Sequence, residues 1–377
     1  MNQFKGYRFT KMHLNASFVN RREEQAMIGR RLKVARASAG LSLRELAARM
    51  EGVVTPQAIG KYERNEDMPG SRALMALASA LGVGESYLLS DDDLVLEGVD
   101  FRKKTSAKEE ATVEALTIQM LERYLAIEDL LQLKSVDWEQ PRSAPYPVSD
   151  IRDAEDAARS VREEWGLGHD PIPKLAELLE ERGIKVLSLD LDDIDGLAAR
   201  VRRHGRDAAR VVVVRRHIWA ERKRFTLAHE LGHMVMAPAA GVDEEKAAHR
   251  FAGAFLMPAD VVRAEVGAHR SSISIGELVA LKERFGVSVQ AIAFRCKDLG
   301  IIDAKAFSEL YREFKRRGWR DPPFKEPAVM QADEEEPRRF ERLCLRALAE
   351  NVIGESRAAE MLGISMRDLD ARLEQVA

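Results

Sequence analysis

The chain has 377 residues, of which 45% are hydrophobic and 32% are charged, and its net charge is −3 at pH 7, which is ordinary for a globular protein of two or three domains. No apolar run approaches the length that crosses a membrane, and residues 1–20 lack the apolar core of a secretion signal, which argues against a membrane or secreted protein. The only cysteines, Cys296 and Cys344, show no spacing of a metal knuckle or disulfide framework, so we expect a cytoplasmic protein.

Residues 28–90 are predicted to form a compact bundle of short helices, after an N-terminal extension of residues 1–27. The four helices are expected over residues 30–36, 42–50, 55–64 and 71–81. Ser42 and Glu45 have the spacing of a capping box, and Thr55 before Pro56 reads as an N-cap followed by proline at the first helical position. The short turn between the second and third helices, residues 51–54, is typical of a helix-turn-helix.

This arrangement resembles the XRE/Cro-type helix-turn-helix, whose recognition helix enters the major groove of double-stranded DNA by its N-terminal residues. The resemblance implies contacts to base edges from Gln57, Ala58 and Lys61. It implies contacts to phosphates from Arg44, Thr55 and Arg64. Gly60 departs from the family, which often has a polar side chain at that position.

The charge distribution favours the same interpretation. Residues 1–90 carry 14 Lys or Arg and 8 Asp or Glu, a net charge of +6, although the whole chain is negative. A basic module on an acidic body fits local phosphate binding, as at a DNA operator. The alternative is a helical domain that binds another protein.

Residues 100–140 are predicted to be a helical linker, with one long helix from Lys108 to Lys134. An apolar stripe follows this helix through Leu116, Met120, Tyr124, Ile127 and Leu131. The stripe is typical of packing; it could join the DNA-binding module to the rest of the chain or pair two protomers in a homodimer. Three prolines between residues 141 and 147 mark a domain boundary.

Residues 145–265 have a mixed pattern. Helices are expected over residues 149–165 and 174–182, and strands over residues 184–191 and 211–214. These strands predict a small sheet packed beside the helix that follows. An exposed edge of that sheet could align an extended peptide by strand addition, although the sequence does not identify the edge strand.

His229, Glu230 and His233 form an HExxH motif in that next helix. Histidines four residues apart lie on one helical face, so both imidazoles can bind one zinc ion. Glu230 can then act as the catalytic proton carrier in the hydrolysis of a peptide bond. The alternative is a surface helix with two solvated histidines; the helical spacing of its neighbouring apolar residues argues against it.

A catalytic zinc ion needs a third protein ligand and one open position. Met236 and Ala239 occupy the positions where a metzincin has Gly and His, which excludes that class. The next candidates, all at the start of a predicted helix ending near Pro258, are Asp243, Glu244, Glu245 and His249. We interpret the first two as charges of the helix N-terminus; either of the last two could face the metal, with the other as its supporting partner.

The motif from Arg224 to His233, with the later helix that ends in Phe255-Leu256-Met257-Pro258, resembles the ImmA/IrrE family of zinc-dependent peptidases. The resemblance implies a zincin-like peptidase domain whose third zinc ligand is Glu245. It places His249 where the family more often has Asn. Known members cut repressors of the XRE type, which suggests this class of protein substrate.

Residues 266–377 are predicted to form a C-terminal helical region. Two segments in it, residues 274–299 and 356–373, have a helix-turn-helix rhythm. We expect the first to pack on the peptidase core and the second to be a helical cap or partner surface; DNA binding by either is the alternative. The acidic run of residues 333–336 is predicted to be a solvated linker.

The predicted fold class is mainly α with a small β-sheet, an α+β protein with an all-α N-terminal bundle. Two functions are consistent with these patterns. In the first, a DNA-binding regulator carries a zinc peptidase that cuts a repressor, a cognate toxin or itself in a stress, mobile-element or toxin-antitoxin response. In the second, a repressor or antitoxin holds zinc as a sensor or scaffold and cleaves nothing. Glu230 favours the first, because a structural zinc site needs no such carboxylate.

Overall fold

The computed structural model describes residues 28–89, 94–99, 106–133, 138–191, 194–321, 324–331 and 333–374. The predicted extension of residues 1–27 lies outside these ranges, as do parts of the predicted linker. The described chain is mainly helical with a four-stranded and a two-stranded sheet, which confirms the predicted α+β class. No helix in these ranges is long and apolar enough to cross a membrane.

The N-terminal bundle consists of five helices around their own small core. They are a helix over residues 28–38, α2 (Leu43–Arg49), α3 (Pro56–Glu63), α4 (Ser71–Leu81) and α5 (Glu85–Leu89). Both predicted caps are present: Ser42 and Glu45 form a capping box on α2, and Thr55 caps α3 ahead of its proline. Leu46, Ile59 and Leu77 lie in the core between these helices.

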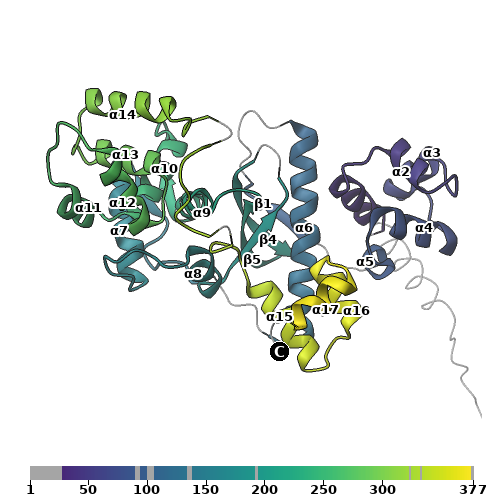
Figure 1. The fold of residues 1–377 in the computed structure, drawn as a ribbon. Coiled ribbons are helices and arrows are strands. Elements are labelled where there is room, and N and C mark those ends of the chain that lie inside the picture. Colours follow the sequence, from purple (N-terminus) through teal and green to yellow (C-terminus); the bar gives the residue numbers. More distant parts are fainter. Residues whose placement is uncertain are drawn as a thin grey trace, which may run out of the picture.

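Two elements follow the bundle: the short strand β1 (Leu94–Glu97) and the long helix α6 (Ala107–Leu130). A buried ion pair ties the bundle to α6, with Arg31 Nη2 and Glu122 Oε1 3.0 Å apart. The predicted apolar stripe of α6 serves packing within the chain, because Tyr124 and Ile127 are fully buried against the sheet and the C-terminal helices. Figure 1 shows α6 standing between the bundle and the sheet.

The main sheet has the strand order β1-β4-β5-β3. Its strands are β1, β3 (Ile184–Leu189), β4 (Gly196–Arg203) and β5 (Arg206–Arg215); β3 runs parallel to β5, and the other pairs are antiparallel. The sequence predicted β3 and the buried part of β5. It did not predict β4, or that β1 from the linker would become an edge strand.

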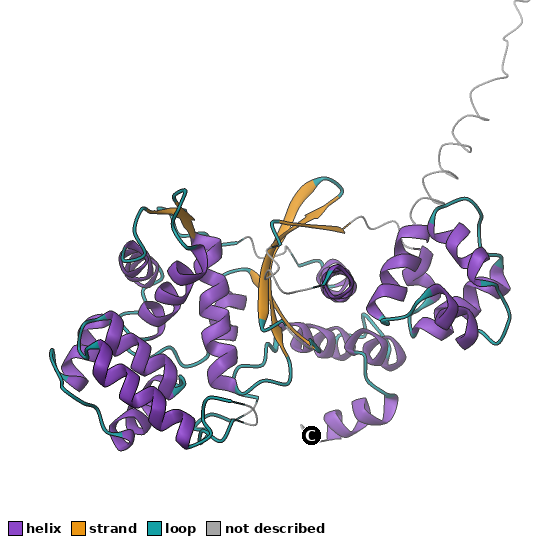
Figure 2. Cartoon of the chain, turned by 90° about the horizontal axis from the view of Figure 1, so that it is seen from above, coloured by secondary structure: helices purple, strands orange, loops and turns teal. Residues whose placement is uncertain are grey.

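Figure 2 shows helices on both faces of the sheet, and the buried residues form two apolar cores, one on each face. On one face it packs against α6 and three C-terminal helices, α15 (Arg339–Ala349), α16 (Glu355–Leu362) and α17 (Met366–Glu374). On the other face it packs against α9 (Ala220–Val235), which carries the HExxH motif. Because α9 lies between the sheet and further helices, almost every side of it is buried, rather than the single apolar stripe that the sequence indicated.

The remaining elements contribute to the same apolar core as α9. They are β2 (Tyr146–Val148), α7 (Asp153–Glu164), α8 (Leu175–Glu181), β6 (Met236–Pro238), α10 (Glu244–Leu256), α11 (Ala259–Val266), α12 (Ile275–Phe285), α13 (Val289–Asp298) and α14 (Ala304–Arg316). The first predicted C-terminal segment, which forms α12 and α13, packs into the same core as α9 and α10. The second forms α16 and α17 and packs beside α6.

The prediction of a solvated linker at residues 333–336 is wrong for its second half, although Asp333 is exposed. Glu335 has no exposed surface and pairs with Arg224 of α9, and Glu336 pairs with the fully buried Lys223. A short acidic run predicts a solvated segment only when its partners are water. Here the partners are two cations of α9 more than 100 residues away, which local sequence does not reveal.

Candidate metal centre

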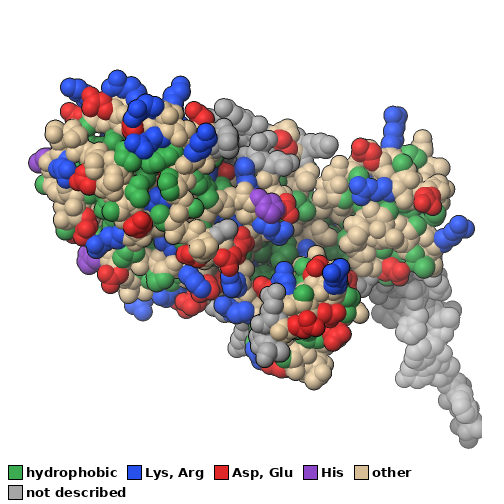
Figure 3. All heavy atoms as spheres, viewed as in Figure 1, with side chains coloured by type: hydrophobic (Ala, Val, Ile, Leu, Met, Phe, Trp, Pro, Cys, Tyr) green, Lys and Arg blue, Asp and Glu red, His purple; other side chains and the backbone are tan. Residues whose placement is uncertain are grey.

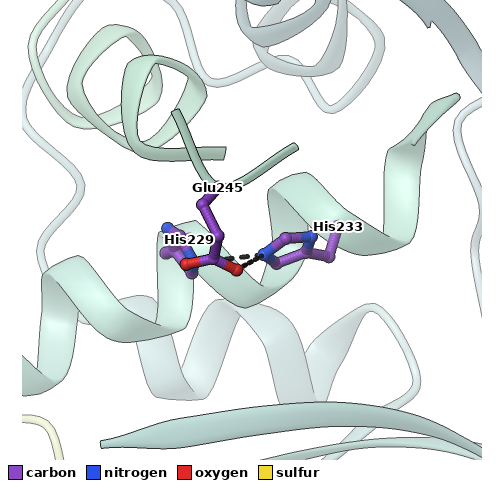
Figure 4. Close-up of side chains that lie close together, drawn as sticks. All are labelled: His229, His233 and Glu245. Atoms are coloured by element: carbon purple, nitrogen blue, oxygen red, sulfur yellow. Dashed lines mark hydrogen bonds and ion pairs between the residues drawn. The ribbon is translucent and has the colours of Figure 1, made fainter. Parts of the chain in front are cut away.

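His229 and His233 lie one turn apart on the same face of α9, as their spacing predicts. Their Nε2 atoms are 3.1 Å apart (Figure 4). His229 is 3% exposed, while the side chain of His233 is 23% exposed and opens toward solvent. The pair therefore has one deeply held imidazole and one at the mouth of the site.

Glu245 reaches the two histidines from the first turn of α10. Asp243 caps this helix by accepting the Lys246 N–H, which fixes where the helix begins. The carboxylate oxygens of Glu245 lie 3.6 Å from His229 Nε2 and 3.3 Å from His233 Nε2. The structure thus gathers His229, His233 and Glu245 and leaves Asp243 in the capping role expected for it.

These three residues fit a zinc ion. Ligand atoms that each lie 2.0–2.1 Å from a tetrahedral zinc are about 3.3 Å from one another. The two histidine Nε2 atoms are 3.1 Å apart. Each has one Glu245 oxygen at a similar distance, Oε2 at 3.6 Å from His229 and Oε1 at 3.3 Å from His233, so all three separations are close to that spacing. Two imidazoles and one carboxylate are also the donor set of one class of catalytic zinc site.

His249 lies one turn beyond Glu245 on α10 and contacts the site through its ring. The His249 and His229 rings pack with centroids 4.6 Å apart, and the Phe225 ring lies 5.7 Å from His249. Of the two candidates that the residues alone left open, Glu245 is therefore the one that joins the cluster. His249 packs against the His229 ring from the next turn of α10.

Gly232 sets the distance between α9 and α10. A Cβ atom at this position would lie 3.0–3.3 Å from three atoms of the Phe251 side chain on α10. Phe251 is fully buried and stacks on Phe255, so the ring has little room to move. Glycine, which has no Cβ atom, therefore allows α9 to pack closely against the helix that carries Glu245.

Glu230 points from α9 toward the beginning of β4. It is 6% exposed, and its Oε1 lies 3.4 Å from the place where a Cβ atom on Gly196 would stand. That hypothetical Cβ would also clash with Thr226 and with the carbonyl oxygen of Val213. Gly196 therefore lets β4 pass close to α9 at Glu230, and Glu230, Gly196 and the two histidines line the same pocket.

The centre opens into a pocket of about 540 Å³. Besides the motif residues, it is lined by residues in or next to strands that the sequence interpretation missed: Glu97, Gly98, Gly196, Ala198, Ala199, Arg200 and Arg210. The alternation of Leu197, Ala199 and Val201 with more polar neighbours is the period-two signal that could have revealed β4. The contribution of β1 carries no comparable signal, because this strand has only four residues.

The predicted DNA-contacting residues lie on the N-terminal bundle. Gln57 and Lys61 of α3 and Arg44 of α2 are exposed. Ala58 is partly buried against the bundle core, and Thr55 Oγ1 accepts the Ala58 N–H in its capping role. The side chain of Arg64 is 59% exposed and pairs with Glu66 at 2.6 Å.

A second concentration of basic side chains lies outside the bundle. Figure 3 shows Lys and Arg gathered over α14. Arg316 and Arg317 there both pair with Glu313, at 2.8 and 2.6 Å, and all three side chains contact solvent. This face reads as a solvated helix surface stabilised by its own ion pairs.

Two family models match the chain. The helix-turn-helix family matches residues 32–88, and the IrrE N-terminal-like domain, a peptidase family, matches residues 179–297. The second match runs from α8 into α13 and so contains the whole His229, His233 and Glu245 cluster. The chain therefore combines a DNA-binding helix-turn-helix with a peptidase-like domain, and the predicted fusion is confirmed. No curated protein and no solved structure matches the chain.

Proposed function

We propose that this chain is a DNA-binding regulator that hydrolyses a peptide bond in a partner protein, using a zinc ion held by His229, His233 and Glu245. The observation that carries the proposal is the close cluster of these three side chains, with nitrogen–nitrogen and nitrogen–oxygen separations of 3.1, 3.3 and 3.6 Å. Glu230 lies in the same pocket, beside the strand where a peptide would bind.

The residues divide the work of peptide hydrolysis. Zinc, when bound, acts as a Lewis acid that polarises the peptide carbonyl and lowers the pKa of water. Glu230 takes the proton from the attacking water and gives it to the nitrogen that leaves as the C–N bond breaks. The buried position of Glu230 between α9 and β4 holds its carboxylate in place and keeps bulk solvent from it.

The substrate backbone is proposed to bind the open edge of β4. β1 pairs with Arg200–Arg203 of this strand, and among the described residues no strand pairs with the same edge at residues 196–199. Those residues line the pocket beside Glu230. An extended peptide added there gains main-chain hydrogen bonds and lies across the metal centre.

The biological setting belongs to the same proposal. The helix-turn-helix would hold the chain on a double-stranded DNA operator through Lys61, Gln57 and their neighbours. The protein cut is proposed to be an XRE-type repressor, a cognate toxin or the chain itself, in a stress, mobile-element or toxin-antitoxin response. A cytoplasmic location follows from the need to reach DNA.

The first test is the metal content of the purified full chain. We expect about one zinc per chain in the wild type, loss of zinc in His233→Ala and Glu245→Ala, and retention in Glu244→Ala. Glu244 is the matched control because it precedes Glu245 and also lines the pocket. Equal zinc in all four proteins, or none in the wild type after zinc is supplied, would remove the metal centre from the proposal.

The second test separates the peptidase from a non-proteolytic regulator. The wild type is expected to cleave a protein captured by the chain, while Glu230→Gln keeps zinc and DNA binding but does not cleave. If the zinc-loaded wild type cuts no protein that it binds, the domain is a metal-holding sensor or scaffold. Cleavage by Glu230→Gln at the wild-type rate would assign the proton carrier to another group.

A further inference from the structure

The pocket of the candidate metal centre has a second, basic end. Arg200 of β4 and Arg210 of β5 lie directly opposite each other in the strand register, and both line the pocket. Period-two alternation places Gly196, Ala198 and Arg200 on one face of β4, the face that approaches α9 at Glu230. The two guanidinium groups therefore belong to the same surface as the three proposed zinc ligands.

The positive charge of this end is only partly balanced. Burial, and then the neighbouring charge of Arg200, lower the pKa of Arg210. The nearest carboxylate that pairs with Arg210 is that of Asp207, at 3.9 Å, and the Asp207 side chain is 58% exposed. Arg200 forms no ion pair with any residue that the structure describes, and Glu97 pairs with Arg202 at 3.1 Å. Two adjacent like charges with weak compensation favour the binding of an anion between them.

The path of the proposed peptide leads to these two arginines. A peptide paired with residues 196–199 of β4 would end where β1 begins to occupy the same edge, at Arg200. Strand geometry puts Arg200 about 13 Å along β4 from Gly196, which is four residues. A group on the peptide three or four residues from the cleaved bond would therefore meet Arg200 and Arg210.

We propose that Arg200 and Arg210 form a carboxylate-binding subsite, through which the pocket selects substrates with an Asp or Glu side chain, or a free C-terminal carboxylate, three or four residues from the cleaved bond. The inference rests on the proposed peptidase function and names its substrate preference. Guanidinium groups suit this role because they bind carboxylates with paired hydrogen bonds.

Peptides that anchor themselves at the metal centre provide the test. The probes are alanine-based hexapeptides that carry a zinc-binding hydroxamate at either end, with Glu or Gln placed at each position in turn. In the probes with an N-terminal hydroxamate, the C-terminus is either a free acid or an amide. Binding to the zinc-loaded full chain is measured by calorimetry, so that no catalytic turnover is needed.

The wild type is expected to bind a Glu or free-acid probe at least about tenfold more tightly than its Gln or amide counterpart, at a spacing of three or four residues. A gain in affinity that depends on the position of Glu in the probe would identify an acidic side chain as the group that binds the subsite. A gain only from the free acid would identify the C-terminus. In Arg200→Gln/Arg210→Gln the gain should disappear, while the Gln amide probes bind as before.

Two further variants keep this outcome interpretable. The double charge reversal Arg200→Glu/Arg210→Glu is expected to reverse the preference, so that a further probe with Lys at the same position binds better than the Glu probe. Arg312→Gln, which removes a charge on the distant α14, should change nothing. If all probes bind through the hydroxamate with no charge preference, the subsite is refuted and the metal centre stands. If no hydroxamate probe binds the zinc-loaded chain, the proposal that this pocket binds peptides at the metal centre is refuted, and the proposed subsite is refuted with it.

Discussion

Arg224 and Glu335 form a buried ion pair across 111 residues of sequence. Nε of Arg224 donates to Oε1 of Glu335 at 2.7 Å, and the two side chains are 4% and 0% exposed. The same carboxylate accepts the N–H groups of Leu175 and Ala176, the first two residues of α8. Glu335 lies in the segment between α14 and α15. Its side chain therefore joins α9, which carries the two histidines of the proposed zinc site, to the beginning of α8.

Glu335→Ala should destabilise the chain strongly. It would leave the Arg224 guanidinium buried without its carboxylate and two N–H groups of α8 without their acceptor. Removing one partner of a buried pair costs about 3–5 kcal/mol. Urea unfolding of the full chain measures this change. The control is Asp333→Ala, which breaks an exposed pair with Arg338 in the same segment and should cost about 0–1 kcal/mol. Equal losses in the free energy of unfolding for the two variants would show that the Glu335 pair does not stabilise the position of α9.

Glu180 is expected to make stability depend on pH. Burial raises the pKa of this carboxyl to about 7. The hydrogen bonds that it accepts from the backbone N–H groups of Arg339 and Arg338 lower the pKa and only partly offset burial. The folded chain therefore holds a proton that the unfolded chain releases near pH 4.5. The contribution to stability is fully present below that pH and is lost as the pH rises through about 7.

The variant Glu180→Gln keeps the shape of the side chain and cannot ionise. Its free energy of unfolding, minus that of the wild type, should increase by about 2–4 kcal/mol from pH 4.5 to pH 8. Urea unfolding of both proteins across this range gives the difference. Glu181→Gln, the exposed neighbour, serves as the control. A difference that stays constant with pH would mean that Glu180 is ionised throughout.

Local patterns were enough to predict several parts of the fold. The caps at Ser42 and Thr55, and the helical face shared by His229 and His233, are encoded within five residues of sequence. Such features depend on backbone geometry that every helix shares, so they do not depend on tertiary contacts with the rest of the chain.

Features that depend on distant partners were not predictable in this way. Glu335 lies in a run of acidic residues, a pattern that predicts a solvent-exposed segment. It is buried because it pairs with the buried Arg224, a partner that the local sequence does not reveal. The residues of β1 follow a helical bundle in sequence, and they become a strand because the edge of β4 offers hydrogen bonds. Arg200 and Arg210 reach the pocket through strand register, which a single sequence does not give.

Gly232→Ala should weaken zinc binding without removing a ligand. The new methyl group would press on Phe251, and α10 would have to move away from α9, which changes the distance from Glu245 to the two histidines. We expect a loss of zinc affinity of about tenfold and a loss of stability of about 1–3 kcal/mol. Competition with a chromophoric chelator measures the affinity.

Gly276→Ala is the matched control for this change. Gly276 is also a helical glycine, in α12, but a Cβ atom there would meet nothing within 4 Å. Alanine at this position should leave zinc affinity unchanged and raise stability by up to about 1 kcal/mol. Unaltered zinc affinity in Gly232→Ala would indicate that α10 tolerates the methyl group, and that the α9–α10 spacing does not set the geometry of the centre.

Lys61→Ala should weaken DNA binding and leave zinc content unchanged. Lys61 is exposed on α3, the proposed recognition helix, whose beginning is fixed by the Thr55 cap. Loss of one cationic contact is expected to reduce affinity by about three- to tenfold, and a contact to phosphate would also lower the salt dependence of binding by about one unit of slope. Gel-shift titrations at several salt concentrations, with duplexes selected from a random pool by the wild type, measure both quantities.

The comparison with Arg312→Ala decides whether the effect is local. This change removes the same charge from α14, where the arginine side chain is 77% exposed and outside the helix-turn-helix. A loss of affinity confined to Lys61→Ala would place DNA on α3. A loss confined to Arg312→Ala would move the DNA-binding surface to the basic face of α14. Equal small losses would mean that binding depends on net charge and that α3 makes no specific contact.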